Sequence, residues 1–140
     1  MKENTTCKTY FAIHGKFDLD EITKIMNLDY TSGHKIGEDK KYGGGVYDWA
    51  SWEYGTENEE TLLANEQLNK IIDVLTPKIE QLQYILKKYD CSFIIEQIPI
   101  VNEGNTPALG YDKKVIDFCY HTNTKIDIDL YVNAWKMELK

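Results

Sequence analysis

The segment IDIDLYV, residues 126–132, alternates between apolar and other side chains. A period of two residues places successive side chains on opposite faces of a β-strand. The segment therefore predicts a strand with Ile126, Ile128 and Leu130 on one face and with Asp127 and Asp129 on the other. This one-sided pattern is typical of an antiparallel sheet that buries one face and exposes the other.

Three further stretches show the same period of two, residues 7–14, 46–54 and 91–101. The stretch 46–54 is rich in aromatic residues, which favour strands. Its alternation places Tyr47 and Trp49 on one face and Trp52 and Tyr54 on the other. In the stretch 91–101, Pro99 predicts an edge strand or a strand end, because proline cannot donate a ladder hydrogen bond.

Two short helices are predicted between strands. Asp18 and Glu21 have the spacing of a capping box, which predicts a helix that ends near Leu28. Asn27 lies near this end, and asparagine tolerates the left-handed conformation of a helix terminus. Asp112 is predicted to cap the second short helix.

The strongest helical signal covers residues 62–88, where apolar side chains recur at spacings of three and four. Thr76 and Pro77 interrupt this pattern. Thr76 is a good N-cap and proline is favoured at the first helical position. The pattern therefore predicts two helices, about 62–75 and 77–88, or one kinked helix.

The predicted order is strand, helix, strand, two helices, strand, helix, strand. This order indicates the α+β class, with a mainly antiparallel sheet, helices packed on one face, and a ferredoxin-like βαβ-αα-βαβ arrangement. The length of 140 residues fits a single domain, 1–140. We expect residues 1–6 and 134–140 to be frayed tails and residues 29–45 to be a long loop.

The composition excludes several classes of function. The formal net charge is −7 and all 16 basic residues are lysine. A negative protein without arginine is a poor candidate for nucleic-acid binding or for arginine-dependent phosphoryl transfer. The same charge favours a basic protein as partner.

The sequence predicts a cytoplasmic protein, since it has neither a signal peptide nor an apolar run near the ~20 residues of a membrane span. Three cysteines, an odd number, predict buried free thiols rather than disulfides.

The chain resembles the bacterial family catalogued as domain of unknown function 4279, from about Tyr10 to Val132. The resemblance lies in six motifs taken in order: residues 11–15, Asp18 with 21–23, 36–38, the tryptophan strand around Trp49 and Trp52, 75–77, and 126–131. It implies a small cytosolic α+β domain and supplies no catalytic residue and no cofactor.

The pair Asp127 and Asp129 has three interpretations. Two carboxylates on one strand face could bind a metal or act as an acid/base pair. They could equally be solvent-facing residues or form a salt bridge to lysine. No calcium-binding loop is present, and the three histidines have no zinc-ligand spacing. We therefore predict no metal site, no catalytic residues and no cofactor.

Aromatic residues provide the other candidate site. Tyr47, Trp49, Trp52 and Tyr54 follow the glycine run 43–45 and are candidates for a recognition patch for a protein or a sugar. The alternative is that these rings pack in the core of the sheet.

We predict a non-enzymatic binding module, of which an immunity-type protein that neutralises a basic partner is one version. The candidate binding residues are Tyr47, Trp49, Trp52, Tyr54, Asp127 and Asp129. One alternative is a small enzyme with a site built from Asp127, Asp129, His14 and a cysteine. Another is a ligand-sensing domain with an apolar pocket. The sequence makes no prediction of the oligomeric state.

Overall fold

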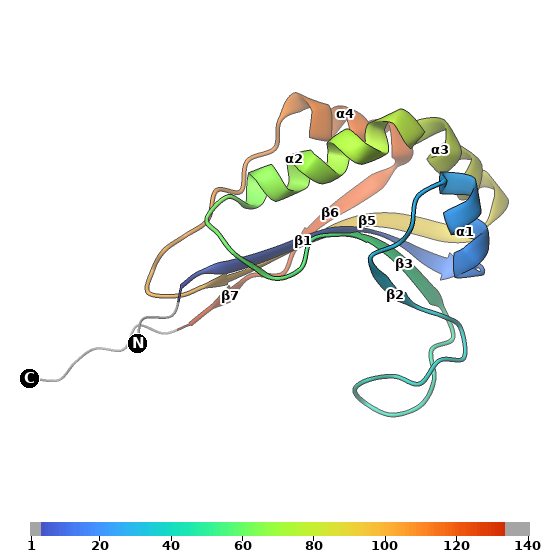
Figure 1. Cartoon of the computed structure of the whole chain (residues 1–140), viewed down its shortest axis with the longest axis horizontal. Coiled ribbons are helices and arrows are strands. Elements are labelled where there is room, and N and C mark those ends of the chain that lie inside the picture. The colour runs from blue at the N-terminus through green and yellow to red at the C-terminus, as the bar shows by residue number, and fades with distance from the viewer. Residues whose placement is uncertain (1–3, 134–140) are drawn as a thin grey trace, which may run out of the picture.

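The structure is a computed structural model that describes residues 4–133. Within this range seven strands form one sheet (Figure 1). The strands are β1 (Thr6–Lys16), β2 (Ser32–His34), β3 (Ala50–Gly55), β4 (Glu59–Glu60), β5 (Asp90–Val101), β6 (Thr124–Ile128) and β7 (Tyr131–Val132). The expected tails fall mostly on residues 1–3 and 134–140, which lie outside the described residues.

The helices in this range are α1 (Leu19–Met26), α2 (Ala64–Leu75), the 3₁₀ turn η1 (Thr76–Lys78), α3 (Ile79–Lys88) and α4 (Lys113–Thr122). Asp18 caps α1 as predicted, with its Oδ1 atom 2.7 Å from the backbone nitrogen of Asp20. Asn27 ends this helix in the left-handed conformation, also as predicted. No helix in the described part of the chain is both long and apolar enough to cross a membrane.

The sheet has the order β2-β3-β1-β5-β6, with β4 beside β1 and β7 beside β5. The long strand β1 lies at the centre, antiparallel to both β3 and β5. Only β6 and β7 run parallel to their neighbour, β5. The predicted α+β fold and its mainly antiparallel sheet are confirmed. In the first strand-helix-strand unit, however, β3 is antiparallel to β1 and not parallel to it, because the long segment after α1 reverses the direction of the chain.

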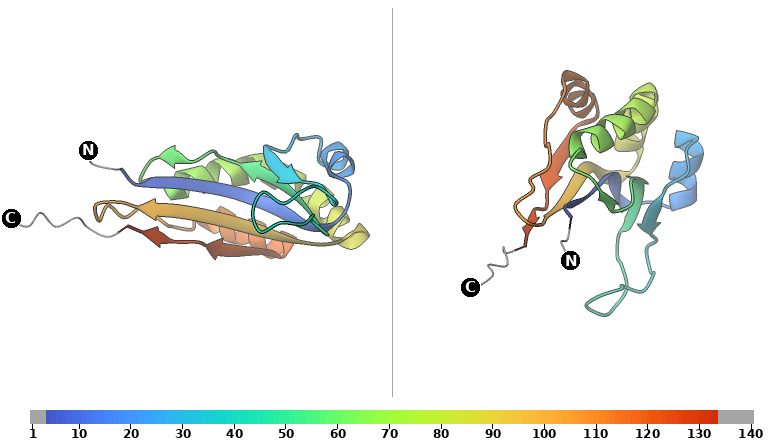
Figure 2. Two further views of the ribbon diagram at one scale, coloured as in Figure 1. Left: turned by 90° about the horizontal axis from the view of Figure 1, so that it is seen from below. Right: turned by 60° about the vertical axis from the view of Figure 1, so that its left-hand side comes forward.

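All four α-helices lie against one face of the sheet, and the segment between β2 and β3 projects on the other side (Figures 1 and 2). The core lies between the helices and the sheet. Phe11 and Ile13 from β1, Phe93 and Ile95 from β5, and Trp52 from β3 all contribute side chains to it. The alternation of these strands therefore sorts one set of side chains into the core and leaves the other set outside.

Several local predictions were wrong. Thr76 does not cap a helix, because its hydroxyl donates to the Ile72 carbonyl and residues 76–78 continue as a 3₁₀ turn. The carboxylate of Glu21 accepts from the Tyr89 hydroxyl instead of completing a capping box. The predicted N-terminal tail is shorter than expected, since Thr5 is buried and Thr6 begins β1.

The predicted strand 126–132 is interrupted between β6 and β7, and Pro99 lies opposite this gap. Gln97 pairs with Ile128 and Ile100 pairs with Tyr131, so no ladder residue faces Pro99 from that side. A proline without an N–H group fits this position. Pro99 therefore lies within a central strand, β5, and marks a break in its neighbour.

Candidate binding surface

The face of the sheet opposite the helices is the candidate functional site, and we call it the open face. No helix among residues 4–133 packs on it (Figure 2). The strand register places these side chains together on it: Lys8, Tyr10, Ala12 and His14 from β1, Ser51 and Glu53 from β3, Ile94, Glu96 and Ile98 from β5, and Lys125 and Asp127 from β6. They come from segments that are far apart in the chain.

Four carboxylates surround Tyr10 on the open face, and we call them the carboxylate cluster: Glu53, Glu96, Asp127 and Asp129. Burial and the negative charges of these four groups raise the pKa of the Tyr10 hydroxyl to about 12. The phenol therefore stays protonated even well above physiological pH, and it can donate a hydrogen bond.

Glu96 and Asp127 are direct neighbours on β5 and β6. Partial burial raises the pKa of Glu96 to about 7, and a hydrogen bond and charge repulsion from Asp127 act in the same direction. The pair therefore retains a proton up to neutral pH, because two adjacent carboxylates resist ionising together.

Few cations balance these acids. Lys8, Lys16 and Lys125 are the lysines that the strand register places on the open face, and the Lys8 ammonium lies 5.4 Å from the Tyr10 ring centroid. Lys16 donates to the Asp48 carbonyl at the base of the arm. The two ion pairs found in the described range, Lys113–Asp117 and Lys114–Asp73, do not involve the carboxylate cluster. The charge of Lys125 partly offsets that of Glu96, but no ion pair in the described range engages the carboxylate cluster, so the open face keeps an excess of acids.

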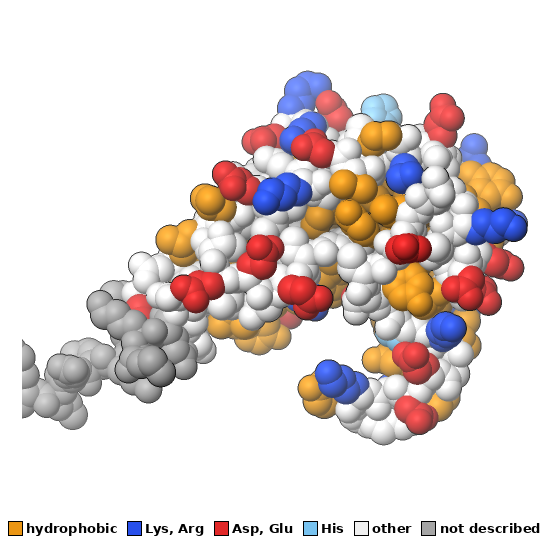
Figure 3. Space-filling view, in the orientation of Figure 1, with side chains coloured by type: hydrophobic (Ala, Val, Ile, Leu, Met, Phe, Trp, Pro, Cys, Tyr) orange, Lys and Arg blue, Asp and Glu red, His pale blue; other side chains and the backbone are white. Residues whose placement is uncertain are grey.

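Residues 35–49, between β2 and β3, form an arm that curves beneath the body of the molecule. The space-filling view shows a hollow between this arm and the rest of the chain (Figure 3). Backbone hydrogen bonds join its two sides, from Gly37 to Tyr47, from Tyr47 to Glu38 and from Lys40 to Gly45. The arm is therefore a hairpin-like extension of β2 and β3 and not an irregular loop.

An aromatic cluster joins the base of the arm to the sheet. The rings of His34 and Tyr47 are stacked, with centroids 3.4 Å apart. Trp49 meets His34 edge-on at 4.5 Å and His14 at 4.8 Å. Because His14 belongs to β1, these rings connect the arm to the central strand.

Both histidines of this cluster sit in surroundings that disfavour their charged form. Burial is the main cause that lowers the pKa of His14, and the proximity of His34 adds to it. Burial also lowers the pKa of His34. The Nδ1 atom of His34 is buried and has no hydrogen-bond partner. Such an unpaired buried polar atom is uncommon in folded proteins.

A pocket of about 280 Å³ opens at the base of the arm, and we call it the arm-base pocket. The residues that line it include His34, Glu38, Asp39, Lys41, Tyr47 and Glu53. Glu53 belongs both to the carboxylate cluster and to the lining of this pocket. The pocket therefore adjoins the carboxylate cluster on the side of the arm.

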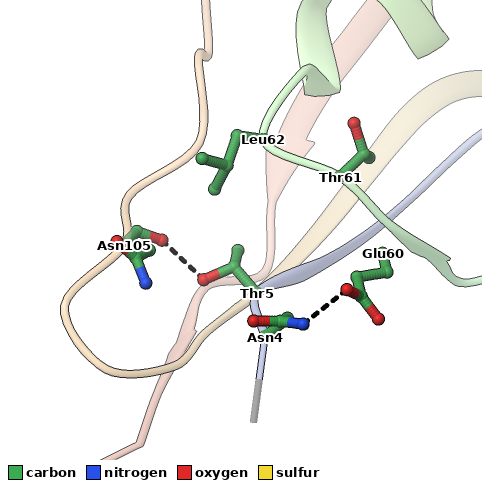
Figure 4. A pocket seen from close by; sticks show the side chains of 6 residues that line it. All are labelled: Asn4, Thr5, Glu60, Thr61, Leu62 and Asn105. Atoms are coloured by element: carbon green, nitrogen blue, oxygen red, sulfur yellow. Dashed lines mark hydrogen bonds between the residues drawn. The ribbon is translucent and has the colours of Figure 1, made fainter. Parts of the chain in front are cut away.

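A second pocket, of about 260 Å³, lies at the other end of the sheet (Figure 4). Its polar side chains bond to the protein itself. The Asn4 amide donates to Glu60 at 2.5 Å, and the Thr5 hydroxyl donates to the Asn105 carbonyl at 2.6 Å. These contacts give the pocket a structural role in fixing the start of β1.

The candidate residues from the sequence divide between the two faces. Tyr47 and Trp49 lie at the base of the arm. Asp127 lies on the open face, and the negative charge of Asp129 reaches Tyr10 there. The indole of Trp52 lies in the core, fully buried, and its Nε1 donates to the Thr23 hydroxyl at 3.0 Å.

Tyr54 also lies on the helix side, partly buried against the core. The proposed enzymatic site does not assemble, because Cys7 and Cys91 are on the helix side of the sheet while His14 is on the open face. The thiol of Cys7 contacts the Thr61 carbonyl, and that of Cys91 contacts the Ile85 carbonyl. Burial raises the pKa of both thiols, which leaves them poorly reactive.

The third thiol, Cys119, is on α4 and packs against the core. Among the residues that the structure describes, no group of three or more His, Cys, Asp or Glu side chains could hold a metal ion.

Sequence reasoning missed Tyr10, Glu53, Glu96 and His34. The first three lie in strands that were predicted, and their alternation is visible in the sequence. What was missing is the register between strands, which alone shows that Tyr10 is opposite Glu96. His34 lies in β2, a strand too short to produce a pattern.

Comparison with known proteins supports the resemblance seen in the sequence. The family model described as "Domain of unknown function (DUF4279)" matches residues 5–133. No curated protein and no solved structure matches the chain.

Proposed function

The chain belongs to the DUF4279 family, and we propose that it is a non-enzymatic binding module whose open face captures a basic protein. The observation that carries this proposal is the carboxylate cluster around Tyr10. Three of its acids come from three strands and the fourth, Asp129, directly follows β6, and they lie on a sheet face that no helix covers in the described range.

The open face combines charge with apolar surface. Tyr10, Ile94, Ile98 and Ile100 are all partly exposed there, between and beside the acids. Protein interfaces mix apolar and polar surface in this way, and tyrosine is enriched in them.

The overall charge supports a basic partner. With a net charge of −7, the chain attracts a positive protein at long range, and the carboxylate cluster orients it at short range. An immunity-type protein that neutralises a basic toxin enzyme is the concrete version, since such pairs depend on fast electrostatic capture.

The test compares two variants that each lose three carboxyl groups. The open-face variant carries Glu96→Gln, Asp127→Asn and Asp129→Asn. The matched control carries Asp20→Asn, Glu66→Gln and Glu80→Gln, three exposed acids in the first turns of α1, α2 and α3. Each immobilised protein is used to capture partners from the native cell, followed by mass spectrometry.

We expect wild-type protein and the control to retain the same stoichiometric basic protein and the open-face variant to lose it. Circular dichroism of all three proteins verifies the fold. If the open-face variant captures the partner as well as the control does, or if no basic protein is retained by any of them, the proposal is wrong.

A further inference from the structure

The arm-base pocket has the chemistry of a receptor for one cationic side chain. We propose that this pocket binds a lysine or arginine side chain of the partner. This inference rests on the proposed function and names the contact through which the chain would recognise its partner. Three features of the pocket support this: its acids, its aromatic ring and an unpartnered histidine.

The acids are available for a ligand. Glu38, Asp39 and Glu53 line the pocket, and the two ion pairs of the described residues do not involve them. The Glu53 carboxylate accepts one hydrogen bond, from the Ser51 hydroxyl at 2.6 Å, which orients it and leaves further lone pairs free.

The aromatic ring of the pocket already attracts a cation. The ammonium of Lys40 lies 5.9 Å from the centroid of the Tyr47 ring, within the range of a cation–π contact. Because Tyr47 is stacked on His34, its ring is fixed in place. Lys41 also lines the pocket, but its ammonium is directed to the Tyr42 ring, 5.9 Å from the centroid. A cationic side chain of a partner can therefore compete for this position.

The histidine supplies the independent observation. His34 is only 9% exposed, it lines the pocket, and its Nδ1 atom has no hydrogen-bond partner. As a neutral imidazole it does not repel a cation, and its lone pair can accept a hydrogen bond from an ammonium or guanidinium group. A ligand N–H group would satisfy an atom that the fold leaves unpaired.

The size of the pocket limits the ligand. A volume of about 280 Å³ lies just below the range of roughly 300–1,000 Å³ that is usual for whole small-molecule ligands. The pocket therefore fits a single side chain better than a complete metabolite.

The experiment titrates isotopically labelled full-length protein with N-acetyl-lysine amide, N-acetyl-arginine amide or N-acetyl-glutamine amide, followed by amide NMR shifts. We expect saturable shifts confined to β2, the arm and β3 with the two cationic probes, and none with the neutral glutamine probe. The relative affinities of the lysine and arginine probes identify the preferred side chain.

Glu53→Gln should lower the affinity for the cationic probes by roughly three- to fivefold, which is the usual size of one exposed charge interaction. The matched control, Glu57→Gln in the exposed loop after β3, should leave their affinity unchanged. The dispersion of the amide spectrum shows that both variants fold.

The proposal is overturned if the glutamine probe binds as well as the cations do, if the shifts map elsewhere, or if Glu53→Gln and Glu57→Gln behave alike. Its failure is distinct from failure of the proposed function. If wild-type protein captures a partner but these probes do not bind, the proposal for the arm-base pocket is wrong. The proposal that the open face binds the partner would then still stand.

Discussion

At the scale of single residues, Glu96 connects the binding surface to stability. Its pKa is raised to about 7 in the folded protein, against 4.5 for a free side chain. The folded state therefore holds this proton more tightly than the unfolded state does. By linkage, stability from this group is fully present below pH 4.5 and is lost as the pH rises through 7.

Glu96→Gln should accordingly raise the melting temperature at pH values above 7 and have little effect, or the opposite effect, below pH 4.5. Glutamine keeps the shape of the side chain without the charge that Asp127 repels. Thermal unfolding of wild-type protein, Glu96→Gln and the control Glu57→Gln across this range measures the effect. A melting temperature of Glu96→Gln that is below that of wild-type protein at high pH would show that burial and the neighbouring Asp127 do not disfavour the charged Glu96 carboxylate.

The two tryptophans of the aromatic strand show what alternation alone can predict. The period of two correctly separated Trp49 from Trp52. It could not decide which ring is in the core, because both faces of the stretch are aromatic. The contact that decides is tertiary: Trp52 reaches Thr23 of α1, and Trp49 reaches His14 of β1.

At the scale of elements, the β2–β3 hairpin depends on the absence of a side chain at Gly33. A Cβ atom at this position would overlap the carbonyl oxygen of Ser51 on the neighbouring strand. Gly33 pairs with Trp52, and the next residue, His34, begins the aromatic cluster. The close approach of the two backbones therefore fixes the pairing of β2 with β3 and the position of His34 in the arm-base pocket.

Gly33→Ala should lower the free energy of unfolding by about 1–3 kcal/mol, since the strands must separate to admit the methyl group. Gly110→Ala is the control, because nothing lies within 4 Å of a Cβ atom there. Urea denaturation measures both variants. Equal stability of the two would mean that β2 moves freely away from β3 and that the hairpin is not held by this contact.

Long elements were predicted better than short ones. The strands at 7–14 and 91–101 and the helices of 62–88 have enough residues to show a period. Ser32–His34 has only three residues, too few to show a period, so the sequence predicts a loop where β2 lies. Thr76 has the residue type that favours an N-cap, but its hydroxyl donates to the Ile72 carbonyl instead of capping a helix. Local rules fail where a competing hydrogen bond is available.

At the scale of the whole molecule, the strand order separates stability from recognition. The sequence allowed a prediction of the α+β class and of one covered sheet face. It could not supply the order β2-β3-β1-β5-β6, because β1 pairs with strands that follow it by about 40 and 80 residues. This order alone gathers Glu53, Glu96 and Asp127 around Tyr10.

The concentration of negative charge on the open face leads to a final prediction about salt. Like charges within a Debye length, about 10 Å at 0.1 M salt, repel each other and destabilise the folded state. Raising sodium chloride from about 0.02 M to about 0.5 M should therefore stabilise the wild-type protein by about 1 kcal/mol, because the carboxylate cluster is screened. Urea denaturation at the two salt concentrations gives this value.

The variant with Glu96→Gln, Asp127→Asn and Asp129→Asn should gain much less from salt than wild-type protein. The matched control with three helix-side acids neutralised should keep most of the gain, because those acids are dispersed over α1, α2 and α3. If both variants respond equally, the repulsion is a property of the net charge of −7 and not of the open face. If only the open-face variant loses the response, the fold maintains at a cost in stability a patch of charge that a basic partner would neutralise on binding.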